Sequence, residues 1–507
     1  MLVVVACDDK VAPLKRQLTL EAFSDLRADE YALNPQLIRE NLEHISRADN
    51  DSNLSSQRIR KYYRHRGSIV WLDASGVDSR ADTLLATLKA RLPEMGFNGE
   101  VFRLKQIGAD LDRIRTLSFD QRNDINSVAA RLEYNLTKAY LRYVTGQHFG
   151  FVNPSYVLNH FAAQSRDTAG RVRSYHHLYD VDMYHPDDDY THRALSRATP
   201  DSLGLYLAEV ARHGQLYDRL REKLAAATDS QKRRILVNME RCRWKNKLTP
   251  HDGEKYVVVN VPAYHLWAVS PDTVIDMRVA CGAVRTKTPL LTSRITHMDV
   301  NPEWSIPLSI VSADIARHAG SEGYFASRRY YIVSRKSGRR VSASQVSSSG
   351  LRSGAYRVVQ QGGAGNALGR IIFRFPNNFS VFLHDTSSPG AFGRDNRGVS
   401  HGCVRVQRPF DLARFMMDRD ADEWLVDRLR LSMGLEPEGD QGRAYRDSLR
   451  PGAKVPTLVR RIEVNPRVPI IITYYTMFQT PDGQMMYYPD VYGYDKAIGE
   501  ALKPYML

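Results

Sequence analysis

The chain has 507 residues, the length of two to four ordinary domains, and 43% of them are hydrophobic, which excludes a mainly disordered protein. No apolar stretch approaches the roughly 18 residues of a membrane-spanning helix, so the sequence excludes an integral membrane protein. The net charge of +14 favours acidic partners, which include nucleic acid, anionic lipid and an acidic polymer such as a cell wall.

The amino terminus is a short apolar run that ends at a cysteine. The segment Val4-Val5-Ala6-Cys7 is similar to the lipobox of bacterial lipoproteins, in which the cysteine is lipidated and the preceding residues are removed. A buried β-strand would explain the same valine-rich run. Residues 1–7 are therefore interpreted either as a truncated lipoprotein signal with Cys7 as the lipidation site, or as a first strand.

The first half of the chain is predicted to be mainly helical. Residues 8–79 are charged and show no sustained period, so an irregular basic region is expected there. Farther on, apolar residues recur at three- and four-residue spacing in the segments 128–143, 203–224 and 230–244, and Gly214 divides the second of them. Residues 80–250 are thus predicted to form a helical domain.

The period changes near residue 254, where runs rich in β-branched residues begin. The strand candidates are residues 256–261, 265–269, 274–280, 330–333, 371–375, 381–383 and 470–477. One helix is expected over Asp411–Arg430, and Pro481-Asp482-Gly483 predicts a hairpin turn. The chain is therefore expected to have an α+β fold, in which the helical half precedes a β-rich half at residues 251–507.

A cysteine and a histidine in the β-rich half are the candidate catalytic pair. His384 ends a predicted strand, and a loop rich in glycine and polar residues separates it from Cys403. A nucleophilic cysteine needs a nearby base or cation because the thiolate attacks and a free thiol has a pKa of about 8.5. Gly402 lets the backbone approach closely, so amides near Cys403 are candidates for holding an oxyanion.

The motif around this cysteine resembles that of a known enzyme family. Ser400-His401-Gly402-Cys403-Val404-Arg405, with His384 upstream, resembles the active-site motif of bacterial L,D-transpeptidases with a YkuD-type catalytic domain. Further segments similar to the large Gram-negative (YcbB-like) subclass are residues 233–244, 256–266, 286–289, 301–307, 366–377 and 469–493. Residues 80–230 resemble the scaffold domain of that subclass, whereas its small wall-binding module has no convincing counterpart.

The resemblance implies roles for particular residues. Cys403 would attack a tetrapeptide stem of peptidoglycan, and His384 would act as its base and later as the acid. The orienting or oxyanion residues would be Ser400, His401, Gly402 and Asp385, and His401 would also shape the acyl pocket. Arg405 would contact a substrate carboxylate. Residues 308–355 occupy the place of a substrate-capping segment, and Trp304 and Tyr324 are expected to line the substrate cleft.

The resemblance also implies substrates, inhibitors and location. A donor and an acceptor peptidoglycan stem would be joined by a 3–3 cross-link with release of D-alanine, although water or a protein lysine would serve as acceptor for the same thioacyl-enzyme. Carbapenem-type inhibitors would acylate the cysteine. No metal or organic cofactor is needed. The expected location is the periplasmic cell envelope, with membrane attachment only through lipid on Cys7.

Other interpretations remain open from the sequence. His384, His401 and Cys403 are all zinc-ligand types, although a fourth ligand is missing. A non-catalytic envelope scaffold would carry the same motif as a remnant. Nucleic-acid binding is not expected, because no helix-turn-helix, zinc finger or aromatic-basic platform accompanies the spread of cations.

Two smaller patterns also remain open. Histidines and aspartates at residues 176–189 form a metal-like cluster, which a hydrated turn around Pro186 explains more simply. Cys242 and Cys281 could form a disulfide, but the sequence does not supply their distance.

Overall fold

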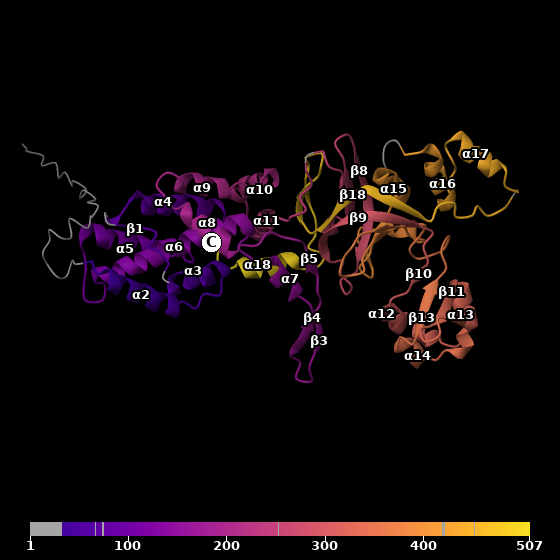
Figure 1. The fold of residues 1–507 in the computed structure, drawn as a ribbon, viewed down its shortest axis with the longest axis horizontal. Coiled ribbons are helices and arrows are strands. Elements are labelled where there is room, and N and C mark those ends of the chain that lie inside the picture. The colour runs from indigo at the N-terminus through magenta and orange to yellow at the C-terminus, as the bar shows by residue number, and fades with distance from the viewer. Residues whose placement is uncertain (1–32, 66, 74–75, 252, 418–420, 451) are drawn as a thin grey trace, which may run out of the picture. The chain divides into compact units, whose positions relative to one another are not determined.

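The computed structural model describes residues 33–65, 67–73, 76–251, 253–417, 421–450 and 452–507. The chain folds into two compact units (Figure 1). The first contains the residues up to Val157, then Met183–Lys245 and Asp495–Leu507. The second contains Leu158–Asp182 and Asn246–Tyr494. The expected α+β class, with a helical region before a β-rich one, is confirmed.

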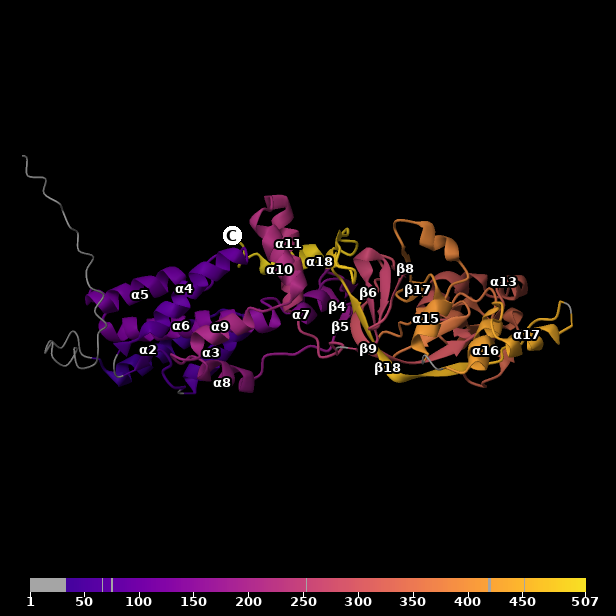
Figure 2. The same cartoon turned by 90° about the horizontal axis from the view of Figure 1, so that it is seen from above.

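The first unit is built around one long helix, α6 (Ile125–Phe149), which other helices surround (Figure 2). The side chains of α6 are buried on nearly every face. Asp124 begins this helix by accepting hydrogen bonds from the N–H groups of Asn126 and Ser127. The surrounding helices are α2 (Pro35–Ala48), α3 (Leu54–Arg64), α4 (Ser79–Glu94), α5 (Leu104–Thr116), α8 (Asp188–Ser196), α9 (Leu203–Val210), α10 (Gln215–Ala225), α11 (Asp229–Arg243) and α18 (Tyr494–Leu502). The three predicted helical segments are therefore confirmed, including the break at Gly214.

The irregular region expected at residues 8–79 is wrong for the part that the structure describes from residue 33 onward. Helices α2 and α3 occupy it and bury Ile38, Leu42, Ile59 and Tyr63 in the same core as α6. Both helices are short and amphipathic, with many charges on their outer faces, so tertiary packing rather than a strong local period stabilises them.

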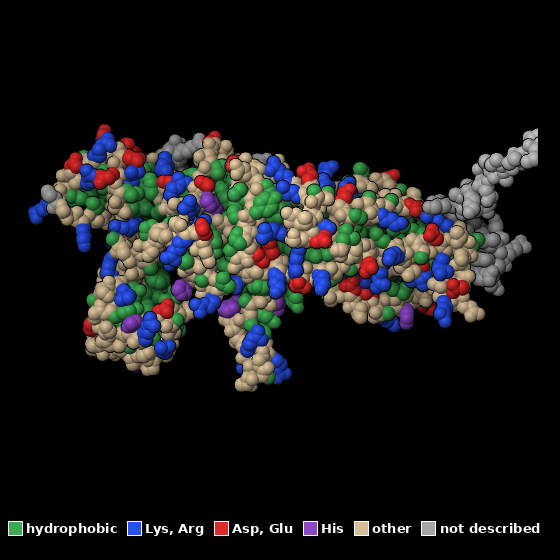
Figure 3. All heavy atoms as spheres, turned by 180° about the vertical axis from the view of Figure 1, so that it is seen from behind, with side chains coloured by type: hydrophobic (Ala, Val, Ile, Leu, Met, Phe, Trp, Pro, Cys, Tyr) green, Lys and Arg blue, Asp and Glu red, His purple; other side chains and the backbone are tan. Residues whose placement is uncertain are grey.

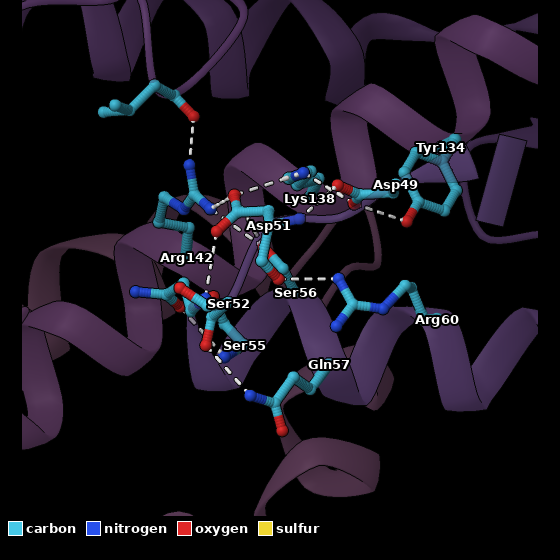
Figure 4. A network of polar contacts seen from close by, with 12 residues as sticks. Asp49, Asp51, Ser52, Ser55, Ser56, Gln57, Arg60, Tyr134, Lys138 and Arg142 are labelled. Atoms are coloured by element: carbon cyan, nitrogen blue, oxygen red, sulfur yellow. Dashed lines mark hydrogen bonds and ion pairs between the residues drawn. The ribbon is translucent and has the colours of Figure 1, made fainter. Parts of the chain in front are cut away.

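Buried charges also join α2 and α3 to α6 (Figure 4). Lys138 Nζ lies 2.6 Å from a carboxylate oxygen of Asp49 and 3.3 Å from one of Asp51, and Arg142 pairs with Asp51 as well. The Tyr134 hydroxyl donates to Asp49 at 2.8 Å. Burial alone would raise the pKa of Asp49, but the hydrogen bonds from Lys138 and Tyr134 hold it below its ordinary value.

The second unit contains a sheet of ten strands (Figure 1). Nine strands follow the hydrogen-bonded order β14-β15-β17-β8-β7-β6-β18-β9-β5, and the tenth, β16, pairs with β8. Strand β9 also pairs with β14, which closes most of the strands into a ring. The strands are β5 (Tyr179–Asp180), β6 (Tyr256–Asn260), β7 (His265–Val269), β8 (Val274–Gly282), β9 (Leu290–Val300), β14 (Ile371–Arg374), β15 (Leu383–His384), β16 (Gly398–Ser400), β17 (Val404–Val406) and β18 (Arg461–Thr473).

A small group of elements with its own core is inserted between β9 and β14. Its four-stranded sheet has the order β10-β13-β11-β12. The elements are β10 (Trp304–Ser305), β11 (Tyr330–Ser334), β12 (Arg340–Val341), β13 (Tyr356–Gln360), α12 (Leu308–Ile310), α13 (Glu322–Ser327) and α14 (Ser348–Arg352). Phe325, Ile332, Leu351 and Val358 are among its buried residues. We call residues 304–360 the inserted subdomain; it includes the expected capping segment 308–355.

Two segments depart from the single domain boundary expected at residue 250. The hairpin β3 (Ala163–Arg166) and β4 (Val172–Tyr175) belongs to the β-rich unit, because β5 directly after it pairs in parallel with β9. Residues 495–507 belong to the helical unit, where Ile498, Leu502 and Tyr505 are buried in its core. Strand pairing and burial over long sequence distances decide both assignments, and a local pattern does not contain that information.

The single helix expected over Asp411–Arg430 is two helices, α15 (Pro409–Met416) and α16 (Glu423–Met433). Met417 is extended after the first helix, and the Asp422 carboxylate accepts from the Trp424 N–H to begin the second. A third helix, α17 (Asp440–Asp447), follows. The predicted turn at residues 481–483 joins β19 (Met477–Gln479) to β20 (Met485–Tyr487) and is confirmed.

Candidate active site

The loop before Cys403 is a tight turn held by one serine. The Ser400 hydroxyl donates to the Cys403 carbonyl at 2.5 Å and accepts from the Gly402 N–H at 3.1 Å. Gly402 has a φ of +121°, a conformation that residues with a Cβ rarely adopt. Its carbonyl accepts from the Thr288 hydroxyl at 2.8 Å, which ties the loop to the segment after β8. The Ser-His-Gly-Cys spacing is therefore required by the backbone geometry of the turn.

Parallel strands bring His384 and Cys403 to the same part of the sheet. Leu383 of β15 lies opposite Val404 of β17, and His384 lies opposite Arg405. This register sets Phe382 beside Cys403 and the histidine two residues farther along. The two candidate residues therefore lie on or next to neighbouring strands.

The backbone of Asp385 orients His384. Nδ1 of His384 lies 2.5 Å from the Asp385 carbonyl oxygen, and the ring forms a second hydrogen bond with the Leu368 backbone. The Asp385 carboxylate does something else: it accepts from the N–H groups of Arg370 and Thr386, both at 2.7 Å. Burial lowers the pKa of His384 to about 4, so its imidazole is neutral at pH 7.

The Cys403 thiol is half-buried and lies 3.9 Å from the Ser380 carbonyl oxygen, to which it donates. Burial raises the pKa of this thiol above its ordinary value, while the Phe382 backbone and the guanidinium groups of Arg374 and Arg405 lower it in part. The resting site therefore combines a neutral thiol with a neutral imidazole. The thiolate must form when a proton moves from sulfur to a base.

Two arginines provide positive charge to this site. Arg405 was expected from its place in the motif, and its Nε is buried with no hydrogen-bond partner among the described residues. Arg374 was not expected; it lies on β14, stacks on Phe382 at 4.5 Å and pairs with Asp299 at 2.8 Å. The sequence placed Arg374 only in a predicted strand. Its position near Cys403 depends on which strands are neighbours, and the sequence does not show that.

The oxyanion role expected of the Gly402 amide is not supported. That N–H already donates to the Ser400 hydroxyl. The Cys403 N–H has no acceptor among the described residues and remains a candidate donor. The motif alone does not show which of the Gly402 and Cys403 amides is free to donate to an oxyanion, because the position of the Ser400 side chain decides this.

A pocket of about 420 Å³ lies beside the cysteine loop, and His401 and Gly402 both line it. The exposed His401 side chain is thus placed where a substrate can reach it. The opposite wall includes His176 and His177, which follow the β3–β4 hairpin. The sequence gave no indication of this wall, since these histidines suggested a separate metal cluster.

Trp304 and Tyr324 pack against the core of the inserted subdomain, and neither lines the pocket next to Gly402. Tyr324 is stacked on His318 with ring centroids 3.8 Å apart and lies under Arg328. Their contact with a substrate stays a prediction.

The remaining candidate sites have simple structural explanations. Asp187 begins helix α8 by accepting from the Tyr190 N–H, and Asp188 pairs with Arg58 and Lys61. Across the described ranges, no group of three or more His, Cys, Asp or Glu side chains could hold a metal ion.

The other cysteines are also accounted for. Cys242 and Cys281 are free thiols, and burial raises the pKa of each to about 12. Cys7 and the segment 1–7 lie outside the described residues. Among the helices that the structure describes, none has the length and apolar character to cross a membrane.

Comparison with known proteins identifies two domains. Residues 254–427 match the YkuD family model, an L,D-transpeptidase catalytic domain, and residues 57–224 match a scaffold domain. The chain therefore contains a YkuD-type L,D-transpeptidase catalytic domain together with a scaffold domain. This combination is consistent with the YcbB-like architecture that the sequence resembles.

Individual relatives agree with this assignment. A Haemophilus influenzae protein named "Putative L,D-transpeptidase" is 24% identical over 335 residues, which are 64% of this chain and 62% of that protein. The match thus spans less than two thirds of the relative's length. A solved L,D-transpeptidase from Mycobacterium smegmatis is 14% identical, with a TM-score of 0.19, over 43% of this chain and 58% of its own. The assignment rests on the family models rather than on that structure.

Proposed function

We propose that this chain is a peptidoglycan L,D-transpeptidase that forms 3–3 cross-links through a thioester on Cys403 and releases D-alanine. The observation that carries the proposal is the parallel pairing of β15 with β17, which sets His384 and Arg405 opposite each other next to Cys403. The catalytic-domain match over residues 254–427 spans all three residues. The proposal therefore rests on a family assignment and a local geometry that agree.

The first step acylates the enzyme. The imidazole of His384 accepts the thiol proton, and the Cys403 sulfur attacks the carbonyl carbon that links the diaminopimelate L-centre to the terminal D-alanine. A C–S bond forms, and the carbonyl oxygen takes on negative charge beside the Cys403 N–H. When the C–N bond breaks, the imidazolium of His384 returns its proton to the departing amine, so D-alanine leaves as a neutral amine.

The second step transfers the acyl group. An amine of a second stem attacks the thioester carbon, and His384 takes the proton that this nitrogen loses. The C–S bond then breaks and the thiolate recovers the proton from His384. No oxidation or reduction occurs, and the thiol is regenerated. Water as the acceptor would give an L,D-carboxypeptidase, and a protein lysine would give an anchoring enzyme.

Positioning residues support this chemistry. Asp385 fixes the imidazole through its carbonyl oxygen, and Ser400 holds the cysteine loop. Arg405 has a buried, unpartnered Nε next to the nucleophile, which suits attraction of a substrate carboxylate and stabilisation of a thiolate.

The substrate places the enzyme in the cell envelope, and we propose a periplasmic location with lipid on Cys7 as its attachment. The inserted subdomain is proposed to cover the bound stem. The net charge of +14 suits an acidic wall polymer, with no role in binding nucleic acid.

Labelling with a carbapenem tests the acyl-enzyme. The wild-type protein should gain the mass of one carbapenem on Cys403, whereas the C403S variant should gain none. The buried free thiol of Cys281 serves as an internal control and should stay unlabelled. Absence of labelling on Cys403 in folded protein would favour a non-catalytic envelope scaffold instead.

A further inference from the structure

The hairpin β3–β4 lies outside the segment that matches the catalytic domain, yet it is anchored to that domain. The N–H of Leu290 donates to the Leu178 carbonyl at 2.9 Å, and the Asn378 side chain donates to Asp180 at 2.8 Å. The ring of His177 lies 5.2 Å from that of Phe379. Residues 158–182 are therefore a fixed wall of the β-rich unit rather than part of the helical one.

This wall and the cysteine loop enclose a pocket whose lining contains two cations and no carboxylate. Arg285 and Lys287 are the cations, the histidines His176, His177 and His401 also line it, and no Asp or Glu does. Lys287 Nζ donates to the Val284 carbonyl at 2.6 Å and lies over the ring of Phe161 from the hairpin side, which restricts the ammonium group. Figure 3 shows further Lys and Arg side chains on the projecting hairpin. Such a lining suits carboxylates.

The chain direction past Cys403 indicates which part of a bound substrate would lie in the pocket. Val381 lines the pocket, Phe382 follows beside Cys403, and His384 comes two residues later in β15. Along the segment 381–384, the pocket and the imidazole thus lie on opposite sides of the nucleophile. The leaving and attacking amines must be on the His384 side, because His384 exchanges protons with them. The part of the donor that stays attached to the Cys403 sulfur would therefore lie on the other side, in the pocket.

We infer that residues of the β3–β4 hairpin segment, His176 and His177, together with Arg285 and Lys287, form an acyl-donor subsite. Its ligand is an acidic peptide whose carboxylates lie on the amino side of the scissile carbonyl. This inference rests on the proposed function, and it adds that a segment outside the catalytic-domain match determines donor specificity.

The test uses full-length protein and two synthetic tetrapeptide donors. They differ only in the groups on the amino side of the scissile bond, which are free carboxylates in one and carboxamides in the other. Single-turnover acylation of Cys403 is followed by mass, and the half-saturating concentration is separated from the limiting rate. The wild type should be half-saturated at about tenfold lower concentration by the acidic donor.

Two double variants address the two walls: R285Q/K287Q, and H176Q/H177Q. Each should raise the half-saturating concentration of the acidic donor several-fold and reduce the preference over the amidated donor, with the limiting rate within about twofold. The control R171Q removes a cation from the hairpin turn, where Arg171 pairs with Asp167 outside the pocket, and should behave as wild type. Alkylation of Cys403 by iodoacetamide, unchanged in all variants, reports an intact nucleophile.

The outcomes separate the two proposals. If both donors acylate the wild type equally well, or if both double variants keep the full preference, the donor subsite is refuted while the transpeptidase proposal stands. If neither donor acylates the wild type, the proposed function itself fails.

Discussion

The two units handle buried charge in opposite ways. In the helical unit, Lys138 and Arg142 are matched by Asp49 and Asp51 at hydrogen-bonding distance (Figure 4). Around Cys403, Arg405 forms no ion pair with an Asp or Glu among the described residues, and Cys403 is the group that interacts with its charge. The Nε atoms of Arg142 and Arg405 are both buried without a hydrogen-bond partner in that part of the chain, so the carboxylate partner is what differs. A charge-matched network stabilises one arrangement, whereas an unmatched cation beside the candidate nucleophile is available to a substrate. The comparison therefore separates a structural cluster from a functional one.

The largest expected effect comes from removing the base. His384→Gln should reduce the rate of thioester formation by about 10²- to 10⁴-fold, because glutamine cannot take the thiol proton. Stopped incubation with the acidic donor and mass measurement would give the rate, and thermal unfolding would report on the fold. A variant that acylates at the wild-type rate would assign the base to another residue.

Removing a charge from the helical network should affect stability instead. Lys138→Met leaves Asp49 and Asp51 with less positive charge in a buried setting, and we expect a loss of about 3 kcal/mol in the free energy of unfolding of the helical unit. Urea unfolding, monitored by hydrogen exchange of the α6 amides, measures this free energy of unfolding. The matched control R47A removes an exposed cation from a surface pair and should cost under about 0.5 kcal/mol. Equal effects of the two variants would contradict the structural role of the network.

The pH dependence of thiol reactivity tests the neutral resting pair. Burial raises the pKa of Cys403 and lowers that of His384 to about 4, so both groups are neutral at pH 7. The thiolate fraction should therefore rise about tenfold per pH unit from pH 6 to beyond pH 8.5. Alkylation by iodoacetamide, read by mass on Cys403, measures this slope. A flat rate between pH 5 and 7 would instead indicate a preformed thiolate–imidazolium pair.

A smaller effect is expected from the serine that shapes the loop. Ser400→Ala removes the hydrogen bonds to the Cys403 carbonyl and from the Gly402 N–H. Acylation should slow by about tenfold because the cysteine is held less firmly. The exposed control S196A, whose hydroxyl donates only within α8, should not change the rate. An unchanged rate in S400A would mean that Gly402 alone fixes the turn.

The candidate catalytic residues could be predicted from the sequence, but the pocket lining around them could not. The motif at residues 400–405 and His384 upstream can be recognised because a nucleophile, its base and a required glycine have fixed residue types. The hairpin wall depends on β5 pairing with β9, a contact over more than a hundred residues, which no period reveals. The packing of Trp304 and Tyr324 against a small core was equally hidden, because an aromatic residue in a core looks the same in sequence as one in a cleft.

Backbone detail was equally out of reach. The motif suggested the Gly402 amide as an oxyanion donor, and only the position of the Ser400 hydroxyl shows that this amide is already engaged. In the amino-terminal region, the many charged residues of α2 and α3 made their apolar stripes hard to recognise in the sequence. These two helices are stable because α6 packs against them.

The most direct measurement is the product analysis of purified protein incubated with muropeptides that carry tetrapeptide stems. We expect a 3–3 cross-linked dimer and one released D-alanine for each cross-link, and neither product from the C403A variant. Free D-alanine with tripeptide and no dimer would assign water as the acceptor. Full cross-linking by C403A would contradict the thioester mechanism.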